Sequence, residues 1–130
     1  MKYTRGFTVI ELLIVVVLFV AASLLFFIQK NNVEVAARDD IRKSSINAMY
    51  YSLEEVYFKE NKSYPRTINT TLLPSIDPDR LKDPNGVKIG EAESNFSYDA
   101  TNCDGDTCKA YTLRTTLENE DDYIKTNRTN

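Results

Sequence analysis

Apolar residues are concentrated at the start of the chain. From Leu12 to Ile28 the only polar residue is Ser23. With residues 7–11 added, the segment would form about 33 Å of helix, and the apolar core of a bilayer is about 30 Å thick. The pattern therefore predicts a transmembrane helix over residues 7–28.

Residues 29–60 contain neither proline nor glycine, so the helix is expected to continue past the apolar segment. Apolar residues recur there at spacings of three, four and seven, which is typical of one helical face. This face comprises Val33, Ala37, Ile41, Ala48, Met49, Leu53 and Val56. The charged residues are expected largely off this face: Arg38, Asp39, Arg42, Lys43, Glu54 and Glu55. We predict an amphipathic helix that packs on a sheet, with a weak point at Asn31-Asn32 because asparagine is a poor helix former.

Residues 61–130 are predicted to form a globular region of loops and antiparallel strands. Pro65 ends the helical pattern, since a proline disfavours helix in the residue before it. The segment up to Gly86 is loop-like, and four apolar residues are expected to hold it to the core: Leu72, Leu73, Ile76 and Leu81. The polar tail 126–130 is expected to fray.

Alternation of apolar and polar residues marks the strands of this region. One strand carries Phe96, Tyr98 and Ala100, and the next carries Tyr111, Leu113, Thr115 and Leu117. A short last strand is expected at Tyr123-Ile124. The predicted fold class is α+β, a long N-terminal helix with a transmembrane half and an amphipathic half, packed on a small antiparallel β-sheet.

Composition narrows the possible functions. The chain has 130 residues, no histidine, two cysteines and a net charge of −3, which fits one globular domain. Without histidine, His-dependent catalytic triads and most catalytic zinc sites are excluded. No nucleophile–base motif is visible, so we expect no enzyme, no catalytic residue and no cofactor. The acidic balance without a basic cluster argues against direct nucleic-acid binding.

Glu11 is the one charged residue within residues 7–28. A carboxylate costs roughly 3 kcal/mol at the centre of a membrane helix and less near its end. The apolar segment offers no Lys or Arg to compensate it, so a cationic partner could come from another molecule. The alternative is that Glu11 lies among the lipid headgroups. Lys2 and Arg5 precede the segment and favour a cytoplasmic N-terminus.

A secretory signal peptide is a second interpretation of the same segment. Its cleavage site would be Val20-Ala21-Ala22, before Ser23. The apolar residues continue beyond this point, and Glu11 would interrupt the hydrophobic region of such a peptide. Both features oppose this interpretation.

The segment 6–13, Gly-Phe-Thr-Val-Ile-Glu-Leu-Leu, resembles the class III signal sequence of type IV pilins and type II secretion pseudopilins. The resemblance implies that residues 1–6 are a leader, which prepilin peptidase removes by cutting after Gly6. The same enzyme would then N-methylate Phe7. Glu11, at the fifth mature position, would pair with the N-terminal ammonium of a neighbouring subunit and set the register of assembly.

This resemblance implies a structural subunit of a type IV pilus or related filament, first held in the inner (cytoplasmic) membrane by a single helix. It would later lie in a cell-surface or periplasmic filament. The implied partners are other pilin-like subunits, prepilin peptidase, an inner-membrane assembly platform and membrane lipid. Ile28 stands where major pilins commonly carry proline, which favours a minor or atypical subunit. A secretion or competence pseudopilin, and a membrane-anchored binding or sensor domain that is never cut, remain alternatives.

Cys103 and Cys108 flank a predicted hairpin tip, Asp104-Gly105-Asp106-Thr107. A disulfide closing this short loop would stabilise the fold by about 2 kcal/mol and would fit an oxidising compartment. The acids Asp99, Asp104 and Asp106 could approach a calcium ion, but a solvated acidic turn is favoured because hard cations require six or more oxygens. We therefore predict a disulfide and no metal site.

Overall fold

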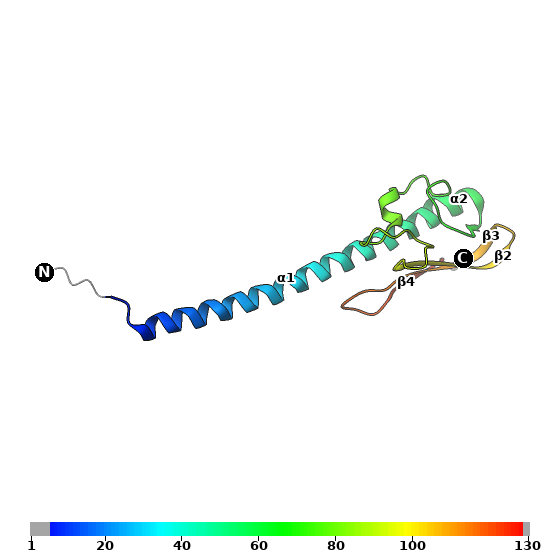
Figure 1. Cartoon of the computed structure of the whole chain (residues 1–130). Coiled ribbons are helices and arrows are strands. Elements are labelled where there is room, and N and C mark those ends of the chain that lie inside the picture. Colours follow the sequence, from blue (N-terminus) through cyan, green and yellow to red (C-terminus); the bar gives the residue numbers. More distant parts are fainter. Residues whose placement is uncertain (1–5, 129–130) are drawn as a thin grey trace. The chain divides into compact units, whose positions relative to one another are not determined.

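The computed structural model describes residues 6–128, so the predicted leader residues Lys2 and Arg5 lie outside the described part. The helical elements are α1 (Val9–Tyr51), the π-helix η1 (Ser52–Tyr57), α2 (Phe58–Asn61) and the 3-10 turn η2 (Pro78–Leu81) (Figure 1). The strands are β1 (Tyr64–Pro65), β2 (Phe96–Asp104), β3 (Thr107–Thr115) and β4 (Tyr123–Thr126). The fold is α+β, as the sequence predicted.

The chain divides into two compact units whose boundary lies between Val35 and Ala36, within α1. Residues 6–35 are called the N-terminal unit below, and residues 36–128 the globular unit. The helix α1 runs through Asn31-Asn32 without interruption, so the predicted weak point is wrong. An ion pair between Lys30 and Glu34, 3.7 Å apart, spans these asparagines, whose intrinsic cost is at most about 0.7 kcal/mol each.

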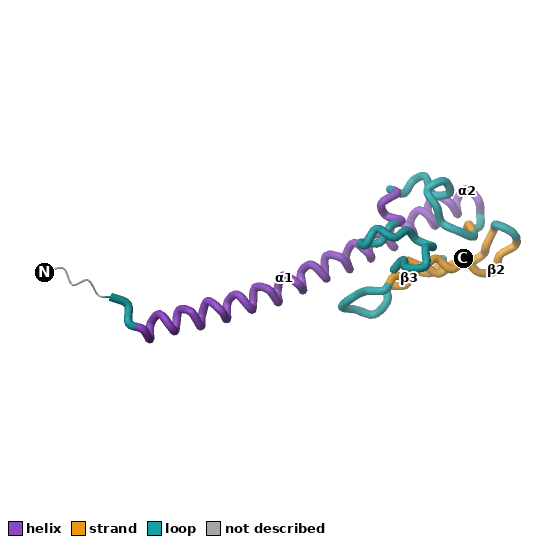
Figure 2. The backbone as a smooth tube through the Cα atoms, viewed as in Figure 1, coloured by secondary structure: helices purple, strands orange, loops and turns teal. Residues whose placement is uncertain are grey.

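The sheet is antiparallel and centred on β3, which pairs with β2, β4 and β1 (Figure 2). The register places Phe96 opposite Thr115, Tyr98 opposite Leu113 and Ala100 opposite Tyr111. The predicted alternation is confirmed by the burial of the aromatic and leucine side chains on this inner face. Strand β1 was not predicted, because a strand of two residues has no alternation to detect.

The core of the globular unit lies between the helix and the inner face of the sheet. Ile46, Met49 and Leu53 are fully buried there against the sheet residues. The long loop contributes Leu73, Ile76 and Leu81 to the core, as predicted; Leu72 is half-buried.

The predicted apolar face of the helix is only partly the face that packs. Met49 and Leu53 are buried, but Val33, Ala37 and Ile41 are exposed. The face turned to the rest of the globular unit follows the spacing Asp39, Arg42, Ile46, Met49 and Leu53. Asp39, Arg42 and Glu54 are 3%, 4% and 4% exposed, so the prediction that the charges lie off the packed face is wrong for these three.

Asp39 and Arg42 can be buried because the loop between β3 and β4 supplies their partners. The Asp39 carboxylate accepts the backbone N–H of Glu118 at 3.0 Å and that of Asn119 at 3.2 Å. Arg42 donates to Asp39 at 2.7 Å and to Glu118 at 2.8 Å. Burial alone would raise the pKa of Asp39, but these backbone and guanidinium donors outweigh it and hold the pKa below its usual value.

Glu118 is the exposed end of the same charge cluster. Arg38 donates two hydrogen bonds to its carboxylate, at 2.7 and 2.6 Å, and Arg42 donates a third. These guanidinium groups lower the pKa of Glu118 to about 2. The loop between β3 and β4 is therefore fastened to α1 by charge.

The π-helix η1 turns Glu54 into the core. Ser52, Leu53 and Glu54 are three consecutive buried residues, which the wider turn of a π-helix allows more readily than an α-helix. The Glu54 carboxylate accepts hydrogen bonds from the hydroxyls of Tyr111 at 2.8 Å and Tyr64 at 3.1 Å. Burial, together with this carboxylate, raises the pKa of both tyrosines, which keeps their hydroxyls protonated as donors.

Residues 126–128 are bound to the rest of the globular unit, although the sequence predicted a frayed tail. Asn127 exchanges hydrogen bonds with the backbone of Tyr111, each 3.3 Å long. The Arg128 N–H donates to Glu54, and its guanidinium donates to Glu55 at 2.6 Å. The expectation of a frayed tail is thus wrong for residues 126–128; residues 129–130 lie outside the described part.

The side chain of Asp83 holds the segment that precedes β2. This carboxyl group is buried and accepts the backbone N–H groups of Asn85 at 2.9 Å, Val87 at 3.0 Å and Asn95 at 3.1 Å. Gly86, at φ 85°, completes the turn by donating its N–H to the Asp83 carbonyl. One side chain therefore holds both the turn and the start of β2.

Candidate functional site

The residues of the predicted processing site lie at the start of the N-terminal unit. Gly6 and Phe7 are exposed and precede the helix, which begins at Val9. A Cβ at Gly6 would meet no atom within 4 Å, so packing within the chain does not require glycine here. The Gly6–Phe7 bond is thus outside regular structure and sterically open.

Thr8 caps this helix, a feature that the sequence analysis missed. Its hydroxyl accepts the backbone N–H of Glu11 at 3.3 Å, and its carbonyl accepts the N–H of Leu12 at 3.1 Å. Thr8-Val9-Ile10-Glu11 fits the capping-box pattern, in which Ser or Thr precedes Glu or Gln by three residues. The Thr-x-x-Glu spacing could have predicted this cap from the sequence.

Glu11 lies in the first turn of α1 and is exposed. A carboxylate at this position interacts favourably with the N-terminal end of the helix dipole. Gly6, Phe7, Thr8 and Glu11 line one hollow of about 330 Å³, so the structure brings the predicted processing and assembly residues together. The carboxylate therefore has a local role at its own helix end and is also open to another molecule.

The apolar part of α1 is exposed in the described part of the chain. Its most apolar 18-residue window has a mean hydropathy of 3.0 and contains no buried residue. The hydroxyl of Ser23 donates to the carbonyl of Phe19 at 2.8 Å, so this polar group is satisfied within the helix. By length and composition this N-terminal helix is able to cross a membrane.

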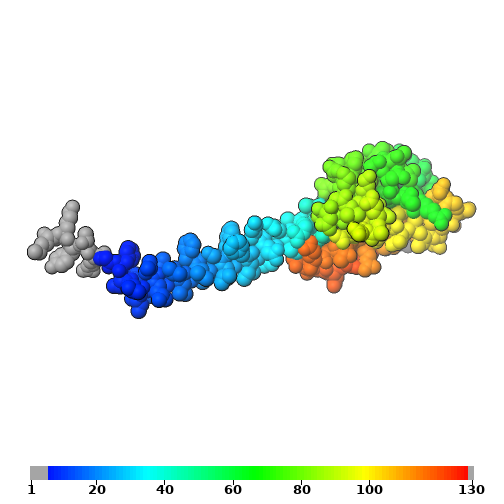
Figure 3. Space-filling view, viewed as in Figure 1, coloured from blue at the N-terminus to red at the C-terminus, as the bar shows by residue number. Residues whose placement is uncertain are grey.

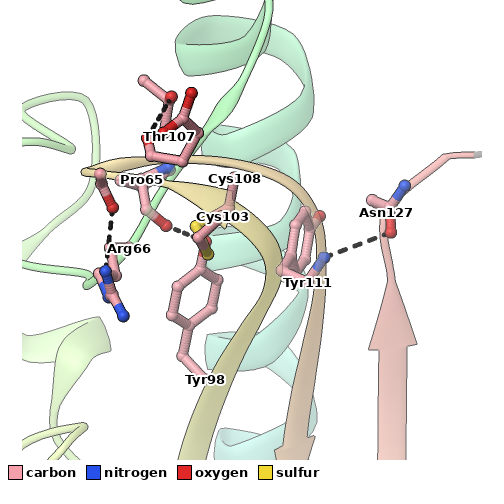
Figure 4. Close-up of a disulfide and its surroundings, with 10 residues drawn as sticks. Pro65, Arg66, Tyr98, Cys103, Thr107, Cys108, Tyr111 and Asn127 are labelled. Carbon is pink, nitrogen blue, oxygen red and sulfur yellow. Dashed lines mark hydrogen bonds between the residues drawn. A yellow bond between two sulfur atoms is a disulfide. The ribbon is translucent and has the colours of Figure 1, made fainter.

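Cys103 and Cys108 form a disulfide, which confirms the predicted pairing (Figure 4). They lie opposite one another on β2 and β3, next to the hairpin turn. Tyr98 donates its hydroxyl to the Pro65 carbonyl at 2.7 Å, and Arg66 donates to the Gly105 carbonyl at 3.0 Å. The bridge joins β2 to β3, and the two hydrogen bonds tie this hairpin to the segment after α2.

The acids considered for calcium binding do not form a metal site. Asp99, Asp104 and Asp106 are exposed on and beside β2. Within residues 6–128, no group of three or more His, Cys, Asp or Glu side chains is placed to hold a metal ion.

No family model, curated protein or solved structure matches this chain.

Proposed function

We propose that the protein is a structural subunit of a type IV pilus or a related filament, processed after Gly6 and assembled through its N-terminal helix. The observation that carries the proposal is a carboxylate in the first turn of a helix whose apolar window is entirely unburied. An exposed apolar surface of this size requires lipid or other protein as a partner. A filament core made of such helices, in which copies cover one another, would supply that partner.

Cleavage after Gly6 would place a new ammonium group on Phe7, beside the hollow that Glu11 also lines. In an assembly of axially shifted helices, the Glu11 carboxylate of one copy would meet the Phe7 ammonium of the next. Charges in a medium of low dielectric constant attract strongly, and an unpaired one is costly. Such a pair would therefore favour one register of packing over all others.

The proposal includes a defined location and set of partners. The precursor lies in the inner membrane as a single-pass protein with a cytoplasmic N-terminus, where prepilin peptidase cuts it and methylates Phe7. An inner-membrane assembly platform then transfers it from lipid to a filament of pilin-like subunits, at the cell surface or in the periplasm. The Cys103–Cys108 disulfide supports an oxidising compartment for the globular unit.

Three variants separate the proposed role of Glu11 from its role at the helix end. Glu11→Gln keeps a residue type that suits a capping box but removes the charge. Thr8→Ala removes the cap observed at 3.3 Å and keeps the charge. We expect Glu11→Gln and Glu11→Ala to remain in the membrane and to stop filament assembly, while Thr8→Ala still assembles. Assembly by Glu11→Gln together with failure of Thr8→Ala would assign Glu11 to capping alone.

The N-terminus of the protein from its native host provides the second test. Mass spectrometry is expected to detect N-methylated Phe7 as the first residue. An intact leader would instead support a membrane-anchored binding or sensor domain, and a chain beginning at Ser23 would support a secreted protein. Material sheared from cells would contain a pilus subunit, whereas a secretion or competence pseudopilin would stay with the cell envelope.

A further inference from the structure

Strand β2 is an open edge of the sheet. It pairs with β3 on one side, and no strand within residues 6–128 pairs with its other side. Natural edge strands are usually shortened or carry proline, lysine or a bulge, which prevents another strand from pairing with them. β2 has nine residues and includes no proline, lysine or arginine. Figure 3 shows yellow atoms, which belong to the part of the chain near residue 100, at the surface of the globular unit.

The free backbone groups of this edge can be assigned from the register. The backbone C=O of Tyr111 accepts the N–H of Asn127, and its N–H donates to the Asn127 side chain, so both groups of Tyr111 point away from β2. Ala100, which lies opposite Tyr111, is therefore in a non-hydrogen-bonded pair, and because the pairing type alternates along the strand, Tyr98 is in one too. The N–H and C=O groups of Tyr98 and Ala100 then point away from β3, and in the described part of the chain they have no other hydrogen-bond partner. Asn102, with φ 54°, ends the extended stretch, which leaves 96–101 as the usable edge.

A hollow lies on the core side of this edge. It measures about 280 Å³, and its lining includes Ile68, Ile89 and Tyr98 together with Arg66 and Glu91. Tyr98 is on the inner face of β2, so a strand added beside β2 would direct every second side chain towards the hollow. An apolar side chain would fit between the two isoleucines and the tyrosine ring.

The outer side of the edge is acidic. Asp99 is exposed there, and residues 92–108 contain four acids and no Lys or Arg. Arg114 lies opposite Ser97 on the outer face, but its guanidinium is engaged by Asp122. Antiparallel pairing of β2 edges from two copies would bring acids together, and like charges on facing strands are destabilising. The charge of the edge thus disfavours a second copy and favours a basic partner.

We propose that the β2 edge binds an extended peptide segment of another protein by strand addition. In this mode, main-chain hydrogen bonds provide affinity and pockets for alternate side chains provide specificity. The segment alternates basic residues, which face Asp99, with apolar residues, which enter the hollow beside Tyr98. The proposal concerns the globular unit of a single molecule and does not depend on filament assembly.

The first test uses the wild-type full-length chain in detergent micelles. The probe is a fluorescently labelled peptide of alternating Lys and Val, seven residues long, and binding is measured by anisotropy. We expect it to bind at least about tenfold more tightly than the matched Glu–Val peptide, a difference of about 1.4 kcal/mol. Equal binding of the two peptides would contradict the proposal, as would dimerisation of the chain through β2 in the absence of peptide.

N-methylation of the peptide tests the backbone geometry. Residues opposite Tyr98 and Ala100 form the hydrogen-bonded pairs with the open edge, so the Val N–H groups face β2 and the Lys N–H groups face solvent. Methylating the Val nitrogens is expected to abolish binding, whereas methylating the Lys nitrogens should leave it almost unchanged. Equal effects of the two modifications would exclude strand addition, and this comparison needs no variant of the protein.

Two variants then locate the site. Asp99→Lys is expected to reverse the preference, so that the Glu–Val peptide binds more tightly than the Lys–Val peptide. Ala100→Pro removes an N–H from the open edge and should weaken binding by at least about tenfold, because proline is tolerated on edges but cannot donate. Asp121→Lys, the same charge change at an exposed position of the β3–β4 loop, is the matched control and should retain the wild-type preference. An unchanged preference in Asp99→Lys would place the peptide elsewhere.

Discussion

The two units of this chain differ in which side chains they expose and which they bury. The N-terminal unit leaves its apolar side chains exposed and satisfies the hydroxyl of Ser23 within the helix. The globular unit buries Asp39, Arg42 and Glu54 and gives each of them hydrogen-bond partners. The globular unit thus packs its own core, whereas the apolar side chains of the N-terminal unit are left exposed, as in a surface that another molecule covers. The same residue type should therefore matter for folding in one unit and for association in the other.

A pair of leucines gives the largest expected difference. Leu53 is 0% exposed and Leu18 is 64% exposed. Leu53→Ala removes core contacts and leaves a cavity, so we expect it to lower the free energy of unfolding of the globular unit by about 2–5 kcal/mol. Leu18→Ala should change the same quantity by less than about 0.5 kcal/mol.

Urea unfolding of the full-length chain in micelles, followed by the near-ultraviolet circular dichroism of the tyrosines, measures both values. Seven of the eight tyrosines lie in the globular unit, so the signal reports on that unit. Similar losses for the two variants would contradict the division into an independent globular unit and a partner-dependent helix.

Two neighbouring glutamates give the next-largest expected difference in unfolding free energy. Glu54→Ala leaves the buried hydroxyls of Tyr64 and Tyr111 without their acceptor, and we expect a loss of about 2–3 kcal/mol in unfolding free energy. Glu55 lies one residue further along and makes ion pairs with Lys59 and Arg128 nearer the surface. Glu55→Ala should cost about 1 kcal/mol or less, because partly exposed ion pairs contribute little. The same urea titration compares them, and equal costs would show that Glu54 is not a buried anchor.

Acid should produce the smallest of these effects, and only in the globular unit. The pKa of Glu118 is lowered from 4.5 to about 2 by Arg38 and Arg42, and the pKa of Asp39 is also lowered. A carboxyl group with a lowered pKa in the folded state binds fewer protons there than in the unfolded state. Its stabilisation is therefore complete above about pH 5 and is lost as the pH falls from 4.5 towards 2.

Thermal unfolding between pH 6 and pH 2 measures this loss. Glu118→Gln should flatten part of the pH dependence, since it removes one of the titrating groups that Arg42 contacts. Glu60→Gln, at an exposed position in α2, is the control and should follow the wild-type profile. A wild-type profile for Glu118→Gln would mean that the charge cluster does not link the β3–β4 loop to α1.

The parts predicted from sequence are those that depend on neighbours along the chain. Alternation located β2, β3 and β4, and the spacing of Cys103 and Cys108 around a turn located the disulfide. The Thr8 cap could also have been predicted, because its Thr-x-x-Glu spacing is local in the sequence.

The parts that were mispredicted depend on residues far apart in the chain. Asp39 meets Glu118 and Asn119 across about 80 positions, and nothing near Asp39 in the sequence indicates that two N–H groups will satisfy its carboxylate. Without those partners a charged residue is best assigned to the solvent side of a helix. The same reasoning misplaced Glu54, whose burial depends on the local π-helix and on hydroxyls from β1 and β3.

The Asp83 carboxylate has a consequence for how the globular unit could vary. It holds Val87 and Asn95 at the two ends of one stretch, and Ile89 also donates its N–H to the Leu81 carbonyl at 2.8 Å, so residues 90–94 form a loop between fixed ends. Residues inserted there would lengthen the loop without shifting the strand that follows. The hollow beside Tyr98, whose wall includes Ile89 and Glu91, could thus be reshaped by insertions while the sheet keeps its register.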